Sequence, residues 1–291
     1  MVYPGGETRC IKGDDFAFQV VPGDNDKLII SFQGGGACWD KASTEIGACT
    51  STAFPDPALG IFDVSNDKNP YKDYTSIHVM YCSRDLHAGN VTRDYADSSG
   101  NPIVQVGYSN TLATLDWAKE NMASTLSSFV LTGQSAGSLG TQVWAEPILG
   151  MFEYEAAAVM PDSYMGVFPD GAQEFLIPDY GMCTNPYISS DLVALCTAGK
   201  ITVQKVFDHG MKAYPNVAWA NINSKYDAVQ MAFYSGIAAT LRMLPLYLTE
   251  AEFNNAMNTI LKTYNENKNY VSYVVTSTMH TYTELPIVFT A

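Results

Sequence analysis

The stretch Leu131–Gly140, LTGQSAGSLG, decides how the rest of the chain is interpreted. Its centre, GQSAG at residues 133–137, has the pattern G-x-S-x-G. When this pattern joins a strand to a helix, the glycines permit a turn too tight for side chains and the serine is raised above the sheet edge. The apolar run SFVL precedes it, and apolar residues recur at helical spacing over residues 138–150. We therefore expect Ser135 to be a nucleophile rather than part of an ordinary Gly/Ser turn.

A second glycine motif follows the apolar run Asp26–Phe32, which is predicted to be a buried strand. Consecutive glycines cost chain entropy on folding, so the triplet at residues 34–36 indicates a need for bare backbone. In serine esterases that need is an oxyanion hole, built from loop N–H groups and from the N–H after the serine. We expect Gly35, Gly36 and Ala136 to supply these donors. A flexible glycine turn is the alternative.

Two later predicted strands, at residues 217–222 and 270–275, end shortly before Asp227 and His280. Serine, then acid, then histidine is the order of the α/β hydrolases. We expect His280 to take the serine proton and Asp227 to orient the imidazole. Asp162 also follows a predicted strand and is the alternative acid.

The other histidines have different contexts. His78 lies within an apolar strand and is expected to be packed, and His209 at a helix end is expected to be a surface or capping residue. His87 follows a strand in a loop, where open α/β sheets place ligand contacts. A substrate contact and a structural role are equally expected for His87, and we take it with Trp39 and Gln134 as a candidate substrate contact. No two histidines have metal-ligand spacing, so neither a metal nor another cofactor is expected.

Composition restricts the partners. Thirty acidic and 16 basic residues give a formal charge of -14, which disfavours nucleic acid and anionic membrane surfaces. No stretch approaches the roughly 18 apolar residues of a membrane span, and no basic-then-apolar signal segment opens the chain. We expect a monomer that acts on an ester substrate and binds neither nucleic acid nor membrane.

Strands that alternate with helices predict an α/β fold, with a mostly parallel sheet and helices on both faces. No linker or internal repeat divides the 291 residues, so one domain over residues 1–291 is expected. The irregular segment around residues 166–197, rich in Pro, Gly, Tyr and Phe, is where a small cap over the pocket would be inserted. Its aromatic residues could instead belong to the core.

Six cysteines, an even number without a C-x-x-C pair, favour three disulfides in an exported protein, secreted or periplasmic. Six reduced thiols in a cytosolic core are the alternative. Cys183 and Cys196 are close enough in sequence to staple the expected cap.

Together these motifs resemble the pectin acetylesterase and Notum family of carboxylesterases. The resemblance rests on the G-x-S-A-G motif and on PGGETRC (4–10), FQGGGACW (32–39), YCSRDLHAGN (81–90), NSKYDAVQ (223–230) and MHTY (279–282). It implies an α/β-hydrolase fold and metal-free deacylation. It also implies Ser135, Asp227 and His280 as the triad, with an oxyanion hole formed by the glycine loop and Ala136.

The resemblance further implies the disulfide pairs Cys10–Cys82, Cys38–Cys49 and Cys183–Cys196. Two features depart from the family pattern. Gly36 occupies a position that is bulky in the family, which leaves the width of the acyl pocket open. The sequence also continues for only eleven residues after His280, where the fold normally adds a helix.

These observations predict a secreted serine carboxylesterase that removes short acyl groups, acetyl first, from a polysaccharide such as pectin or from a small ester. The acidic composition argues against unmodified polygalacturonate, unless Arg84 and Lys225 line the groove. A lipase-like or polyester-cleaving hydrolase is one alternative. An inactive binding module on an esterase fold is the other.

Overall fold

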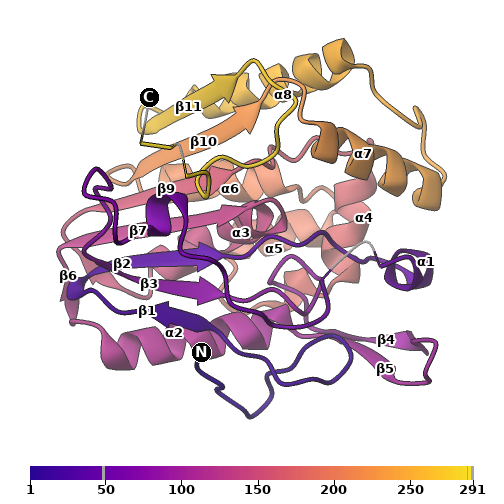
Figure 1. Ribbon diagram of the computed structural model, residues 1–291. Coiled ribbons are helices and arrows are strands. Elements are labelled where there is room, and N and C mark those ends of the chain that lie inside the picture. Colours follow the sequence, from indigo (N-terminus) through magenta and orange to yellow (C-terminus); the bar gives the residue numbers. More distant parts are fainter. Residues whose placement is uncertain (48–49, 287, 290–291) are drawn as a thin grey trace.

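Seven strands form the central sheet of the protein, seen here in a computed structural model that describes residues 1–47, 50–286 and 288–289 (Figure 1). Their spatial order is β1 (Gln19–Val21), β3 (Tyr74–Val79), β2 (Asp24–Phe32), β7 (Ser128–Gln134), β9 (Ala157–Asp162), β10 (Ala218–Ser224) and β11 (Tyr270–Val275). Neighbouring strands run parallel, except that β1 is antiparallel to β3. The carboxyl ends of six strands therefore meet at one edge of the sheet.

The central strands are apolar because both faces of the sheet are covered. The last five residues of β2 and the last six of β7 are buried, as expected for strands in a parallel sheet. Flanking helices cover them: α2 (Gly107–Asn121), α3 (Ala136–Leu149), α6 (Val203–Ala213) and α8 (Glu250–Tyr264). The predicted α/β fold class, with a mostly parallel sheet, is confirmed.

Helix boundaries follow local capping. Helix α8 begins at Glu250, because Thr249 and Glu252 form a capping box. Helices α5 (Ser190–Thr197) and α6 are separated by Gly199, which lies in the left-handed region (φ 61°). Gly199 ends α5 because glycine adopts that conformation without steric cost.

Several elements gather beyond the carboxyl ends of the strands (Figure 1). These are α1 (Lys41–Glu45), α4 (Ala172–Asp179) and α7 (Ala228–Leu241), and α4 contacts α7. The segment expected to form a cap folds as α4, the 3₁₀ turn η2 (Met182–Thr184) and α5. Helix α4 was not predicted, since Gly171 gives it no side-chain cap and Pro178 lies within it.

Short elements complete the chain: the 3₁₀ turn η1 (Gly60–Phe62), the hairpin β4 (Val91–Ala96) and β5 (Pro102–Gln105), and the pair β6 (Thr125–Leu126) and β8 (Glu153–Tyr154). The hairpin was not predicted, although the sequence DSSGN at its turn is a recognisable signal.

Among the described residues lie the disulfides Cys10–Cys82 and Cys183–Cys196, which are pairs that the family resemblance implied. The second joins η2 to α5. The expected pair Cys38–Cys49 lies outside the described residues, because Cys49 is not among them. Within the described ranges, none of the helices is both long enough and apolar enough to cross a membrane.

Candidate active site

Ser135 is the single residue between the end of β7 and the start of α3. Its backbone has φ 57° and ψ −120°, a conformation that non-glycine residues rarely adopt. Strain of this kind, of order 1–3 kcal/mol, persists where the surrounding structure enforces it. Here the N–H of Ser135 donates to the carbonyl of Asp162 at the end of the neighbouring strand β9 (N···O 3.0 Å). The turn is therefore locked to the sheet with its serine at the carboxyl edge.

The glycines of the G-x-S-x-G motif allow two close backbone approaches. A Cβ on Gly137 would lie 1.8 Å from the carbonyl oxygen of Phe32, and a Cβ on Gly133 would lie 2.3 Å from that of Gly137. Real Cβ atoms do not come so close to backbone. The first turn of α3 consequently rests directly on the end of β2, the strand that leads into the second glycine motif.

Substituting Gly137 with alanine is expected to destabilise the fold by about 1–3 kcal/mol and to displace Ser135, because the backbone of β2 would have to move. Urea unfolding and esterase assays measure the two effects. Gly236→Ala in α7 is the matched control, since its Cβ would meet only the Trp39 ring at 3.9 Å. That variant should be as stable as the parent or up to about 1 kcal/mol more stable. Equal stability of the two variants would contradict this account of the turn.

The glycine triplet after β2 faces Ser135. Gly35 and Gly36 have φ values of 146° and 78°, which L side chains rarely adopt, so glycine is required there. Gly36 and Ala136 line the same pocket as Ser135. Ala136 opens α3, and the first N–H groups of a helix have no intrahelical acceptor. Gly35 is not among the lining residues of this pocket, and a Cβ added to it would meet Thr50 Oγ1 at 2.5 Å.

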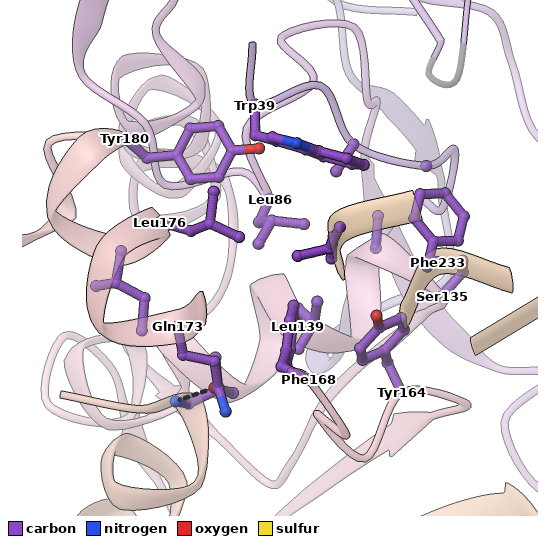
Figure 2. A pocket seen from close by; sticks show the side chains of 16 residues that line it. Trp39, Leu86, Ser135, Leu139, Tyr164, Phe168, Gln173, Leu176, Tyr180 and Phe233 are labelled. Atoms are coloured by element: carbon purple, nitrogen blue, oxygen red, sulfur yellow. Dashed lines mark hydrogen bonds between the residues drawn. The ribbon is translucent and has the colours of Figure 1, made fainter. Parts of the chain in front are cut away.

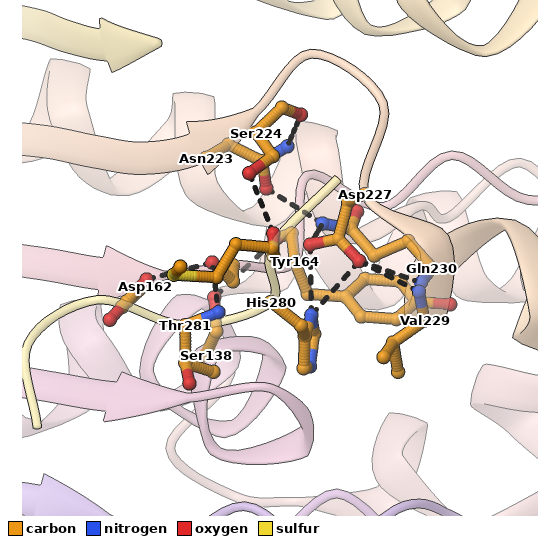
Figure 3. A network of polar contacts seen from close by, with 12 residues as sticks. Ser138, Asp162, Tyr164, Asn223, Ser224, Asp227, Val229, Gln230, His280 and Thr281 are labelled. Atoms are coloured by element: carbon orange, nitrogen blue, oxygen red, sulfur yellow. Dashed lines mark hydrogen bonds and ion pairs between the residues drawn. The ribbon is translucent and has the colours of Figure 1, made fainter. Parts of the chain in front are cut away.

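Asp227 and His280 are in direct contact (Figure 3). The imidazole Nδ1 lies 2.8 Å from Asp227 Oδ2 and 3.0 Å from Oδ1. Asp227 is fully buried at the start of α7, where its Oδ1 accepts the N–H groups of Val229 and Gln230. Its Oδ2 also accepts the side-chain amide of Gln230 at 2.9 Å. Three donors thus fix this carboxylate, which in turn orients the imidazole.

The alternative acid, Asp162, does not touch the imidazole. Its carboxylate accepts the backbone N–H groups of Tyr282 and Thr283 instead. The other nitrogen of His280, Nε2, is buried and has no hydrogen-bond partner within the described part of the chain. No hydrogen bond joins it to Ser135 there, a common state of catalytic groups before substrate binds.

Ser135 opens onto an apolar pocket (Figure 2). Mostly aromatic and aliphatic side chains line it; they come from the loop after β2 (residues 33–39), the 83–90 loop, α3, the 163–168 segment, α4, α6 and α7, and Ser135 and Gln173 add polar groups. Its other lining residues are Gly36, Ala37, Trp39, Leu86, Ala136, Leu139, Tyr164, Phe168, Leu176, Ile177, Tyr180, Val203, Phe233 and Ile237. The wall opposite the sheet therefore comes largely from α4 and α7.

Of the three residues expected to contact the substrate, only Trp39 lines this pocket. Its indole N–H donates to Thr240 Oγ1 of α7 at 2.9 Å, which fastens the loop after β2 (residues 33–39) to that helix. His87 and Gln134 are 1% and 3% exposed and do not belong to the pocket wall. The substrate contacts expected of these two residues are corrected accordingly: both side chains are used inside the fold.

His87 supports the loop after β2 from the buried side, through a contact with Gln33. Its ring stacks on Tyr81, and its Nε2 lies 2.8 Å from the backbone carbonyl of Gln33, which can only accept, so Nε2 carries the proton. Its own carbonyl accepts from Thr111 and from the indole of Trp144. Burial lowers the pKa of His87 to about 4, although the bond to Gln33 opposes that shift. The ring is therefore neutral in the folded protein near neutral pH.

This pKa makes folding stability sensitive to acid. Below about pH 6.5 unfolded chains protonate His87 while folded chains do not until about pH 4, so stability falls as pH falls through this window, by up to about 3 kcal/mol. We expect His87→Gln to show a smaller loss between pH 7 and pH 4.5. Urea unfolding at both values measures it. Parallel pH dependence in the two proteins would show that His87 does not contribute.

Some site residues were missed in the sequence although signals for them exist. Gln230 is one of them: it stands three residues after Asp227, in the D-x-x-Q spacing of a capped helix start. Phe233 and Ile237, spaced i and i+4, share one face of α7. Neither pattern predicts that α7 faces Ser135, which lies almost one hundred residues earlier in the chain.

Sheet order, strand-end serine and flanking helices define an α/β hydrolase. Residues 6–235 match the family model described as Pectinacetylesterase, and the chain belongs to this family. That match contains Ser135 and Asp227 and ends before His280, which the fold places beside Asp227. No curated protein matches the chain.

Two crystal forms of the Wnt deacylase Notum from Drosophila have the same fold. Each superposes with a TM-score of 0.68 at 14% sequence identity, covering 96% of this chain and 84% of the Notum chain.

Proposed function

We propose that the protein is a serine carboxylesterase that works through an acyl-enzyme. The observation that carries this proposal is the 2.8 Å hydrogen bond from His280 Nδ1 to Asp227, formed at the sheet edge that carries the Ser135 turn. Because Nδ1 donates to the carboxylate, Nε2 is left with a lone pair that can accept the serine proton.

In the proposed reaction, Ser135 Oγ attacks the ester carbonyl as His280 Nε2 takes its proton. The N–H groups of Gly35, Gly36 and Ala136 are the proposed donors that stabilise the negative oxygen. Each such donor contributes a factor of roughly 10²–10³ to the rate. His280 then protonates the leaving alkoxide, and activates the water that releases the acyl group.

For the substrate, we propose short acyl esters, acetyl first, on a polysaccharide such as pectin. Membership of the Pectinacetylesterase family supports this choice. The aromatic side chains of Trp39, Phe168 and Phe233 form part of the wall of the pocket onto which Ser135 opens (Figure 2).

A longer acyl chain is the second candidate. The pocket lining is almost entirely apolar, which suits an alkyl chain better than a sugar hydroxyl. The fold is also that of a Wnt deacylase. This candidate corresponds to the lipase-like alternative.

Hydrolysis of p-nitrophenyl esters from acetyl to palmitoyl tests these candidates. The proposal predicts the highest kcat/KM for acetyl or butyryl, whereas a maximum at long chains would replace it with the second candidate. Labelling by a serine-directed phosphonate tests the class itself, since an inactive binding module would not react.

Two further expectations remain proposals. We propose that α4, η2 and α5 act as a cap over the pocket, because Leu176, Ile177 and Tyr180 form part of its wall. We also propose that the protein is exported, because the disulfides Cys10–Cys82 and Cys183–Cys196 persist in oxidising compartments.

A further inference from the structure

Asp162, the fully buried last residue of β9, contacts both the turn that carries Ser135 and the loop that carries His280. Its backbone carbonyl accepts the N–H of Ser135 at 3.0 Å. Its Oδ2 accepts the N–H groups of Tyr282 and Thr283, both at 2.7 Å. We propose that Asp162 is a positioning residue that sets His280 relative to Ser135; the proposal rests on the esterase function proposed above.

The loop that carries His280 needs such support. Residues 276–286 form neither helix nor strand, so no regular hydrogen-bond ladder holds them. Thr281 adopts φ 66°, an unfavourable conformation for a β-branched residue. Its N–H donates to Ser163 Oγ at 2.9 Å, and that hydroxyl donates to Asp162 Oδ1 at 2.8 Å. Three consecutive backbone N–H groups after His280 therefore end on the Asp162–Ser163 pair.

The Asp162–Ser163 pair holds the loop after His280, and the end of β10 holds the residue before it. In Figure 3, Asp162 and Thr281 lie to one side of His280, with Asp227 and Gln230 on the opposite side. Ser224, the last residue of β10, donates through Oγ to the carbonyl of Met279 at 2.6 Å. The general base is thus held between the ends of two adjacent strands, and Asp162 is the one that also holds the nucleophile's backbone.

A carboxylate suits this place because every contact requires an acceptor. Oδ2 accepts the Thr283 hydroxyl at 2.8 Å in addition to the two N–H groups, and Oδ1 accepts the Ser163 hydroxyl. Asparagine has the same shape, but its NH₂ would face the N–H donors of Tyr282 and Thr283 at the Oδ2 position, or would leave the Ser163 hydroxyl without its acceptor at the Oδ1 position. Asp162→Asn should therefore loosen the His280 loop without opening a cavity.

Kinetics of Asp162→Asn test the proposal. Because a displacement of about 1 Å at a reacting group can lower the rate about 100-fold, we expect kcat to fall by about that factor with KM little changed. Phosphonate labelling of Ser135 should slow by a similar factor. A purely structural role would lower the amount of folded enzyme or its Tm, but not kcat per folded molecule.

Ile148→Ala is the stability-matched control. Ile148 is fully buried in α3, about 20 Å along the helix from Ser135, and its truncation weakens the core without reaching the site. Its kcat should equal that of the parent. An equal fall in kcat for both variants, or an unchanged kcat in Asp162→Asn, would overturn the proposal.

Ser163→Ala is the second variant, and it decides the matter if Asp162→Asn does not fold. It removes the acceptor of the Thr281 N–H and leaves the carboxylate in place, so we expect kcat to fall about 10-fold, with unchanged kcat contradicting the proposal. If the parent protein itself neither turns over esters nor reacts with the phosphonate, the proposed function fails. An active parent with fully active variants overturns only the role of Asp162.

Discussion

Ser135→Ala should lower kcat for p-nitrophenyl acetate by about 10⁵- to 10⁶-fold, the loss typical of removing the nucleophile of a triad. Without the hydroxyl no acyl-enzyme can form, while Gly36, Ala136 and the apolar pocket remain in place. KM should change little, and labelling by a serine-directed phosphonate should disappear. Parallel steady-state assays and intact-mass measurement of the labelled protein give both results.

Ser138→Ala is the matched control for this substitution. Ser138 lies one turn further along α3 and is fully buried; its Oγ makes two long hydrogen bonds, donating to the carbonyl of Tyr164 (3.5 Å) and accepting from the side-chain amide of Gln142 (3.4 Å). Its removal should leave kcat nearly unchanged. Residual activity of more than about 1% in Ser135→Ala, against the loss expected for a nucleophile, would mean that another group attacks the ester.

Asp227→Asn should lower kcat by about 10⁴-fold, through the tautomer of His280. The N–H groups of Val229 and Gln230 both donate to Oδ1, so the asparagine oxygen is expected to take that place. Its NH₂ then occupies the place of Oδ2 and donates to Nδ1 of His280. The imidazole proton moves to Nε2, which can no longer accept the proton of Ser135.

The pH–rate profile and Tm of Asp227→Asn test whether the changed tautomer of His280 causes the loss of kcat. The NH₂ of the buried amide also faces the side-chain amide of Gln230, which donates to Oδ2 in the parent, so Tm should fall as well, and kcat must be compared at a temperature where the variant is fully folded. Phosphonate labelling should slow by a similar factor to kcat. A variant that retains more than about a tenth of the parent kcat would assign the acid to another residue.

Asp162 illustrates how far sequence patterns reach. Its place after a strand made it the alternative acid, and the same place explains its observed contacts with the His280 loop. Which of two strand-end carboxylates meets a histidine depends on the position of the histidine loop between β9 and β10. That position follows from the pairing of β11 with β10, and no local pattern encodes such pairing.

His87 and Gln134 show the opposite limit. Both follow or end strands at the functional edge, and both turn inward: Gln134 donates to Thr283 at 3.3 Å, and His87 holds the carbonyl of Gln33. Left-handed backbone at Leu86 and His87 (φ 59° and 61°) turns this loop so that Leu86, not His87, lines the pocket. A sequence alone does not reveal such a turn in residues other than glycine.

From the sequence alone come the α/β fold, the serine turn and the glycine loop, because strand and helix periodicity and the need for bare backbone are local properties. The tertiary structure decides which acid reaches His280, which aromatic residues from α4 and α7 wall the pocket, and which polar residues are buried beneath it. These outcomes depend on contacts between residues far apart in the chain, such as Asp162 with Thr283. Such contacts exist only once the strands have taken their order in the sheet.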